Sequence, residues 1–292
     1  MDERTSTYSS QVIHVGPLWP GISGIKNLFI FGASYCDVRY DFNTSPLPTK
    51  REPLGVAFPG RTYAESGQPN WVGHLVTRLK GETPLLVYDF AHGGDTTDGV
   101  ERQIKDQYIP AIADEPRTSF LRNILSRSQH GISWSASDTL FSIWVGINDC
   151  GYLGVEGVPA QIIKLFALIE LLYEKGSRNF MLIDVPPMQR SPAMKIPKPG
   201  RHSFEEWNDL LRVHASRFAQ DHYDATVIVY SSWETFSRVL DSPVHYGFNA
   251  GDEKKKGGSI WVDHIHPTSK MHDEVAKDVV ALLKGAMRFD VN

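Results

Sequence analysis

The sequence has little cysteine, no long apolar run and no excess of one charge. Two cysteines, Cys36 and Cys150, in 292 residues exclude the disulfide framework of a small secreted protein. No apolar run approaches the roughly 20 residues of a membrane-spanning helix. The net charge of −4 gives no basic surface, so we expect neither a membrane nor a nucleic acid as partner.

The first six residues are polar and lack the apolar core of a signal peptide. The sequence therefore predicts a cytoplasmic protein, or a secreted one if a leader has been removed. A composition of 41% hydrophobic and 22% charged residues is typical of a soluble globular protein. We expect it to be a monomer.

Short apolar runs alternate with helical patterns along most of the chain. Residues at helical spacing, such as Trp71, Leu75 and Leu79, separate the runs. This alternation predicts one α/β domain, residues 26–292, with a parallel sheet between two helical layers. Five runs are predicted as strands: residues 27–31, 85–91, 139–145, 179–185 and 226–230.

Residues 1–25 contain several prolines and glycines and predict an irregular arm. Trp19 and Ile22 are large apolar residues that a free tail would not need, so we expect them to pack the arm on the body. Further along, Ser203 and Glu206 have the spacing of a capping box at the start of a helix.

Polar residues and glycines follow three of the predicted strands. Ser34 follows the first, Gly94 the second and Asn148 the third, while Asp263 and His266 lie near the C-terminus. The carboxyl ends of parallel strands share one edge of a sheet, where α/β folds bind ligands. We therefore expect these five residues to meet there.

Together they supply the parts needed for acyl transfer. Ser34 can be the nucleophile and His266 the base that takes its proton. Asp263, three residues before His266, can orient the imidazole ring. The backbone N–H groups of Ser34 and Gly94 and the side-chain amide of Asn148 can form an oxyanion hole.

Each of these residues also has an ordinary structural interpretation. Ser34 could cap a helix, Gly94 could permit tight helix entry, and Asn148 could belong to a turn. His266, before a proline, could be an exposed loop residue. The three histidines His264, His266 and His272 lack a familiar ligand spacing, so we expect no metal and no other cofactor.

As an ensemble, Ser34, Gly94, Asn148 and His266 resemble the four blocks of the SGNH or GDSL hydrolases. The resemblance extends over nearly the whole chain and is greatest to the fungal acetylesterases of carbohydrate esterase family sixteen. It implies a flavodoxin-like, five-stranded parallel sheet of order 2-1-3-4-5. The stretches that carry it are residues 32–37, 69–72, 93–96, 146–149, 185–188, 207–208 and 263–269.

Two features depart from that family. The motif Gly-Asp-Ser reads Gly32-Ala33-Ser34 here, which removes a carboxylate beside the nucleophile and questions how the loop is supported. The secretion signal usual for these acetylesterases is absent, which questions a plant-polysaccharide substrate.

The sequence thus predicts a serine esterase that removes short acyl groups, acetyl first, from an alcohol or a carbohydrate. One alternative is an acyltransferase or tailoring esterase that acts on an intracellular small molecule with the same site. Another is a carbohydrate-binding protein with an inactive site, which would be expected to lack a nucleophile, base or oxyanion donor.

The two cysteines each lie two residues past a candidate oxyanion-hole residue, Cys36 after Ser34 and Cys150 after Asn148. They could be unrelated small apolar residues packed under the site. Alternatively, they could lie close enough to join on oxidation, which needs Cα atoms within about 7 Å.

Overall fold

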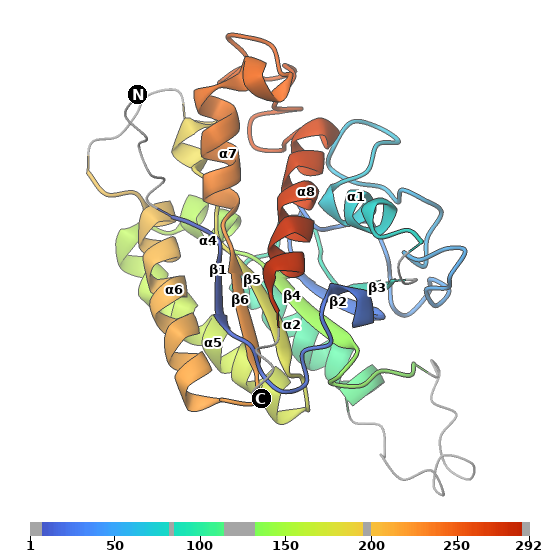
Figure 1. The fold of residues 1–292 in the computed structure, drawn as a ribbon. Helices are drawn as coiled ribbons and strands as arrows, with labels where there is room; N and C mark the ends of the chain where they lie inside the picture. The colour runs from blue at the N-terminus through green and yellow to red at the C-terminus, as the bar shows by residue number, and fades with distance from the viewer. Residues whose placement is uncertain (1–7, 82–84, 114–131, 195–199, 288–292) are drawn as a thin grey trace, which may run out of the picture.

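A six-stranded sheet of order β1-β6-β5-β4-β2-β3 forms the centre of the molecule (Figure 1). The computed structural model describes residues 8–81, 85–113, 132–194 and 200–287. The strands are β1 (Gln11–His14), β2 (Asn27–Gly32), β3 (Leu86–Asp89), β4 (Thr139–Trp144), β5 (Asn179–Ile183) and β6 (Thr226–Tyr230).

Strands β2 to β6 are parallel and confirm the predicted order 2-1-3-4-5. Leu28, for example, pairs with Val87 on one side and with Leu140 on the other. Every residue of β2, β4, β5 and β6 is buried, as expected for a sheet covered on both faces.

The predicted strand number is wrong by one, because the arm contributes β1. This strand pairs antiparallel with β6, with Val12 opposite Ile228. It was missed because it has only four residues, of which only Val12 and Ile13 form an apolar pair between polar neighbours.

Helices cover both faces of the sheet. α1, α7 and α8 pack together in one layer, and α2, α5 and α6 in the other (Figure 1). The helices are α1 (Trp71–Arg78), α2 (Thr97–Arg102) with its π-helical continuation η2 (Gln103–Ala113), α4 (Ile147–Tyr152), α5 (Val158–Glu174), α6 (Ser203–Asp221), α7 (Ser232–Asp241) and α8 (Ser269–Gly285). No helix in the described ranges is long and apolar enough to cross a bilayer.

The start of α6 lies one residue earlier than the predicted capping box. His202 is the N-cap, and its backbone N–H donates to the Glu205 carboxylate at 2.9 Å. Ser203 is free to bond elsewhere, and its hydroxyl donates to the Cys150 carbonyl at 2.9 Å. The N-terminus of α6 is thereby joined to α4.

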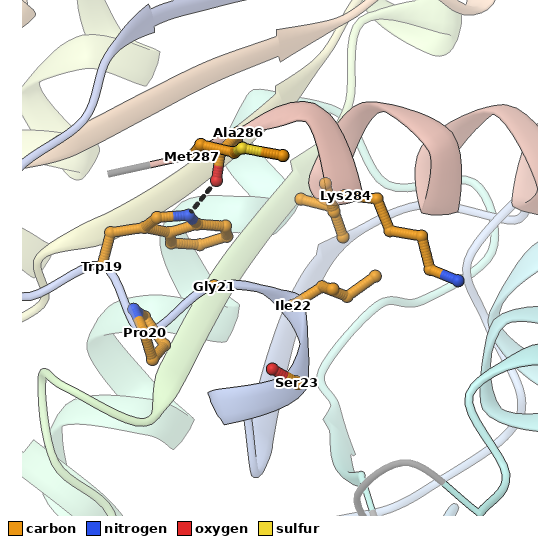
Figure 2. A pocket seen from close by; sticks show the side chains of 9 residues that line it. Trp19, Pro20, Gly21, Ile22, Ser23, Lys284, Ala286 and Met287 are labelled. Atoms are coloured by element: carbon orange, nitrogen blue, oxygen red, sulfur yellow. Dashed lines mark hydrogen bonds between the residues drawn. The ribbon is translucent and has the colours of Figure 1, made fainter. Parts of the chain in front are cut away.

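The arm is packed against the C-terminal end of α8, as Figure 2 shows. The buried Trp19 indole donates to the Ala286 carbonyl at 2.7 Å. Beside it, Ile22 and Met287 help to line a pocket of about 430 Å³. α8 begins at Ser269 and has 17 residues, which places this pocket about 25 Å from the start of the helix.

Candidate active site

Ser34, His266 and Asp263 form a continuous chain of hydrogen bonds at the carboxyl edge of the sheet. The Ser34 hydroxyl Oγ lies 2.9 Å from His266 Nε2, and His266 Nδ1 lies 2.7 Å from Asp263 Oδ2. Ser34 follows β2 directly, and His266 lies three residues before α8. The side chains of Ser34 and His266 are largely buried. In the chain, Asp263 and His266 are three positions apart, and Ser34 precedes Asp263 by 229 positions. The structure brings all three together.

The two oxygens of the Asp263 carboxylate serve different partners. Oδ2 faces the imidazole, while Oδ1 accepts from the backbone N–H of Ile265 at 2.8 Å and of His266 at 2.7 Å. Burial raises the pKa of this carboxyl, but the hydrogen bonds from the His266 ring and the two amides outweigh it, so the pKa lies below its ordinary value. An ionised Asp263 fixes the ring so that Nε2 faces Ser34.

Tyr35 joins the loop of Ser34 to the loop of His266. Its hydroxyl donates to the Ile265 carbonyl at 2.5 Å, and its ring packs near the His266 ring, with centroids 6.2 Å apart. Burial and the nearby Asp263 carboxylate raise the pKa of Tyr35 well above its ordinary value. The phenol therefore keeps its proton and remains a hydrogen-bond donor.

The three candidate oxyanion-hole residues lie on neighbouring loops, after β2, β3 and β4. Gly94 has a φ of +89°, in the left-handed region that favours glycine. Within the described part of the chain, neither the Ser34 nor the Gly94 backbone N–H has an acceptor. The Asn148 side chain donates one N–H to the Asp95 carbonyl at 2.9 Å, which leaves its second N–H available.

Gln103, at the junction of α2 and η2, connects two of these loops. Its side chain accepts from Gly32 N–H at 2.9 Å and donates to the Gly32 carbonyl at 2.8 Å. It also donates to the Asp95 carboxylate at 2.7 Å. Sequence reasoning missed Gln103, because a glutamine on a helix gives no signal until its burial is known.

The third loop is attached through the buried Asp149. Its carboxylate accepts from the Thr97 N–H at 3.0 Å, at the start of α2. Burial raises the pKa of Asp149. Before it, Gly146 has a φ of +120°, and a Cβ there would lie 2.3 Å from the Trp207 ring. The block at residues 146–149 is thus fitted against both α2 and α6.

Two buried carboxyls that the sequence analysis did not single out support the loop after β2. Asp37 accepts from the Gly93 N–H at 2.9 Å, beside Gly94. Asp89 accepts from the N–H groups of Val38 at 3.2 Å and Ala91 at 3.0 Å. Burial, and then the nearby Asp37, raises the pKa of Asp89 well above its ordinary value. The missing carboxylate at Ala33 therefore does not leave this loop without support.

A stacked tyrosine, also missed from sequence, lies against the candidate base. The Tyr63 ring is 4.7 Å from the His266 ring, with 26° between their planes. A Cβ at Gly93 would lie 1.9 Å from the Tyr63 hydroxyl, so only glycine fits beneath it. Tyr63 comes from the long loop between β2 and α1, where the sequence indicated function but no particular residue.

The two cysteines are free and buried, and they have separate partners. Cys36 Sγ accepts from the Trp71 indole of α1 at 3.4 Å. Cys150 Sγ donates to the Ser203 carbonyl of α6 at 3.3 Å. Because α1 and α6 belong to opposite layers of the fold, these contacts favour the packing interpretation over a disulfide. Burial raises the pKa of both thiols.

The histidines considered as metal ligands do not converge. His264 is exposed, whereas His272 is buried on α8. Burial lowers the pKa of His272 to about 3, so this imidazole is neutral. The described residues contain no group of three or more histidine, cysteine or acidic side chains arranged to hold a metal ion.

Comparisons with known proteins agree with the geometry. The family model described as GDSL-like Lipase/Acylhydrolase matches residues 28–279. An acetylesterase of Thermothelomyces thermophilus is 31% identical over 281 residues, covering 89% of each chain. A GDSL lipase of Tanacetum cinerariifolium is 24% identical over 182 residues, covering 56% of this chain and 50% of the relative.

The fold is shared with a solved acetylxylan esterase, Axe2, of Geobacillus stearothermophilus. That structure matches with a TM-score of 0.53 and covers 90% of this chain and 95% of its own. The two sequences are 13% identical, so the likeness concerns the fold alone.

Proposed function

This chain belongs to the GDSL-like lipase/acylhydrolase family and is a serine-dependent carboxylic ester hydrolase; from that premise we propose that it removes short acyl groups, acetyl first, by way of an acyl-enzyme on Ser34. The observation that carries the proposal is the hydrogen-bond chain from Asp263 through His266 to Ser34, at 2.7 and 2.9 Å.

In the first step, His266 Nε2 takes the proton of the Ser34 hydroxyl as Oγ attacks the ester carbonyl carbon. The carbonyl π electrons move to oxygen and form a tetrahedral oxyanion. His266 then gives the proton to the alcohol oxygen, the C–O bond breaks, and the alcohol leaves. Asp263 orients the ring and stabilises the imidazolium that forms between these transfers.

The oxyanion is stabilised by three N–H groups that remain available in the described part of the chain. The Ser34 and Gly94 amides lack an acceptor in the described part of the chain, and Asn148 has one side-chain N–H beyond its bond to Asp95. Since Gln103 and Asp37 fix the loops of Ser34 and Gly94, these donors need little reorganisation during the reaction.

In the second step, His266 removes a proton from water, and the resulting hydroxide attacks the acyl carbon. Collapse of the second tetrahedral intermediate returns the proton to Ser34 Oγ and releases the carboxylic acid. A second alcohol in place of water would give acyl transfer by the same route. The steps use only side chains and backbone amides of the chain itself.

The identity of the acyl and alcohol groups rests on relatives. An acetylesterase 31% identical over most of both chains supports acetyl as the acyl group. A carbohydrate is our preferred alcohol, because the sequence resembles the fungal acetylesterases of carbohydrate esterase family sixteen. A binding protein with an inactive site is disfavoured, since Ser34 and His266 are within hydrogen-bonding distance of each other and the Ser34 and Gly94 amides have no acceptor in the described part of the chain.

The test is a screen of p-nitrophenyl esters of rising acyl length, alongside an acetylated sugar, with product analysis in the presence of an added alcohol. We expect the acetyl ester to be the best substrate and free acetate to be the product. Ser34→Ala and His266→Ala should each lower kcat/KM by at least about 10⁴-fold.

A matched control is Ser45→Ala, because Ser45 lies outside the site. It should retain wild-type activity, and all three variants should unfold within a few degrees of the wild type. Substantial turnover by a folded Ser34→Ala protein would contradict the mechanism. Acetylated alcohol as the main product would show an acyltransferase instead.

A further inference from the structure

Arg39 has a backbone conformation that arginine rarely adopts. With a φ of +61°, it is the single non-glycine residue of positive φ among the residues that the structure describes. Such strain concentrates at functional sites, where surrounding contacts hold it. Here Asp37 holds it: the Arg39 N–H donates to Asp37 Oδ1 at 2.6 Å, and Arg39 Nε lies 3.5 Å from Asp37 Oδ2.

The Arg39 guanidinium lies beside the base through Tyr63. Its Nη2 donates to the Tyr63 hydroxyl at 2.7 Å, and its Cζ is 5.2 Å from the centre of the Tyr63 ring. Tyr63 in turn stacks on His266. Arg39, Tyr63 and His266 therefore form a layered group whose position is fixed by the buried Asp37.

This group is adjacent to the base that protonates the leaving alcohol, because Tyr63 stacks on His266. His266 delivers its proton to the alcohol oxygen in the proposed reaction, so the alcohol half of the ester lies next to the imidazole. Tyr63 also lies over Gly93, the neighbour of the oxyanion donor Gly94, since a Cβ at Gly93 would lie 1.9 Å from the Tyr63 hydroxyl. Side chains packed on His266 are thus close enough to the reacting ester to contact the alcohol as it leaves.

Arg39 retains unused hydrogen-bond donors at this position. A guanidinium has five N–H donors, and in the described part of the chain Nη1 has no partner. The Arg39 side chain is 43% exposed. Its charge is already opposed by Asp37, so the remaining donors suit neutral hydroxyl oxygens better than a second carboxylate.

We propose that Arg39, set by Tyr63, binds hydroxyl groups of the alcohol half of the ester and makes the enzyme selective for polyhydroxylated alcohols over simple ones. This inference rests on the proposed function, because it assigns the alcohol side of the same site. Arg39 is then a specificity-determining residue, and Tyr63 is the positioning residue that holds both the guanidinium and the imidazole.

The experiment compares two acetyl esters, p-nitrophenyl acetate and a mono-acetylated methyl xyloside, in the wild type and in Arg39→Met. For the acetylated sugar, we expect Arg39→Met to lower kcat/KM by about 10- to 100-fold, mainly through KM, since hydrogen bonds to a charged donor are lost in ground and transition state alike. For p-nitrophenyl acetate, whose alcohol half carries no hydroxyl group for Arg39 to bind, kcat/KM should fall by a clearly smaller factor.

Two further variants sharpen the result. Arg61→Met is the matched control, because Arg61 is an exposed arginine of the same loop. Its backbone N–H donates to the Val38 carbonyl, and the substitution keeps that bond. Arg61→Met should leave the ratio of kcat/KM for the two substrates unchanged. Tyr63→Phe keeps the stacked ring but loses the contact with Arg39, so it should shift the ratio in the same direction by a smaller factor.

Equal losses on both esters in Arg39→Met, or no loss on either, would overturn the assignment of Arg39. Failure of the wild type on the acetylated sugar alone would also overturn it. Failure of the wild type on both esters would instead contradict the proposed function. The free methyl xyloside provides a readout apart from turnover of the sugar ester: it should inhibit hydrolysis of p-nitrophenyl acetate less in Arg39→Met than in the wild type.

Discussion

The active-site loops and the Trp19 end of the N-terminal arm are attached to the body of the protein by different means. At the active site, buried polar side chains such as Gln103 and Asp37 bond to the backbone of neighbouring loops. The arm pairs with the sheet through β1, but its later part is seated by the Trp19 ring, which makes one side-chain hydrogen bond, to Ala286, beside an open pocket. Burial of apolar area tolerates small displacements, whereas donors aimed at a developing charge do not. The comparison teaches that polar burial marks where position must be accurate.

The strongest test of this difference is the loss of one donor at the active site. Asn148→Ala should lower kcat by on the order of 10² to 10³, with KM changed much less, because an oxyanion-hole donor acts mainly in the transition state. Steady-state kinetics on p-nitrophenyl acetate measure it, with the exposed Asn43→Ala as control. A raised KM at constant kcat would make Asn148 a substrate-binding residue instead.

Removing a loop connection should have the next largest effect. Gln103→Met keeps the side-chain volume but leaves the Gly32 N–H without its acceptor and Asp95 without one donor. We expect a loss of about 2–4 kcal/mol in the free energy of unfolding. The displaced loops should also lower kcat by roughly 10- to 100-fold. Denaturant unfolding and kinetics on the same preparation test both; unchanged kcat in the destabilised protein would show that Gln103 is only structural.

The buried His272 makes the site end of α8 sensitive to acid. Its folded-state pKa of about 3 lies below the ordinary value of 6.5. Its contribution to stability is therefore present above about pH 6.5 and is lost as the pH falls toward 3, by up to about 1.4 kcal/mol per pH unit. His272→Gln should flatten this acid slope in unfolding measured from pH 7 to 4. An unchanged slope would assign the acid sensitivity to other groups.

The smallest effect is expected at the arm. Trp19→Phe keeps an aromatic ring but removes the hydrogen bond to Ala286, which should cost about 1 kcal/mol of unfolding free energy. Because the pocket lies at the far end of α8, kcat should be unchanged. A fall in kcat comparable to that of Gln103→Met would break the comparison between the two regions.

The fold was predictable where the sequence pattern is strong. The five parallel strands are continuous apolar runs, and the alternation with helices determines the sheet type. The short edge strand β1 was not predictable, because Val12 and Ile13 alone do not distinguish a strand from a loop. The helix start at His202 was displaced by one residue, since Ser203 is the better cap by composition but bonds to Cys150 instead.

The candidate site was predictable in its reacting groups but not in its supports. Ser34 and His266 stand out, because their residue types and their places after strands and before a helix suggest chemistry. Gln103, Asp89 and Tyr63 do not, because polar residues on a helix, a strand end or a loop are ordinary until burial and partners are known. The long loop after β2 was the one available signal, and it pointed to a region rather than to Tyr63.

The two oxygens of the Asp263 carboxylate bind different groups, and this arrangement affects where the chain can vary in length among members of the family. Asp263, the base at His266 and the cap of α8 at Thr268 form one short module with hydrogen bonds inside it. Residues 259–262 fasten this module to the preceding chain, because the Val262 N–H donates to the His266 carbonyl at 2.9 Å and the Thr268 N–H donates to the Ile260 carbonyl at 2.8 Å. Asp252 and Glu253 in turn bond to Ser259 and Trp261. Insertions in residues 242–248, which have no hydrogen bond to residues 259–268 in the described part of the chain, should therefore be tolerated by catalysis better than insertions in residues 249–258.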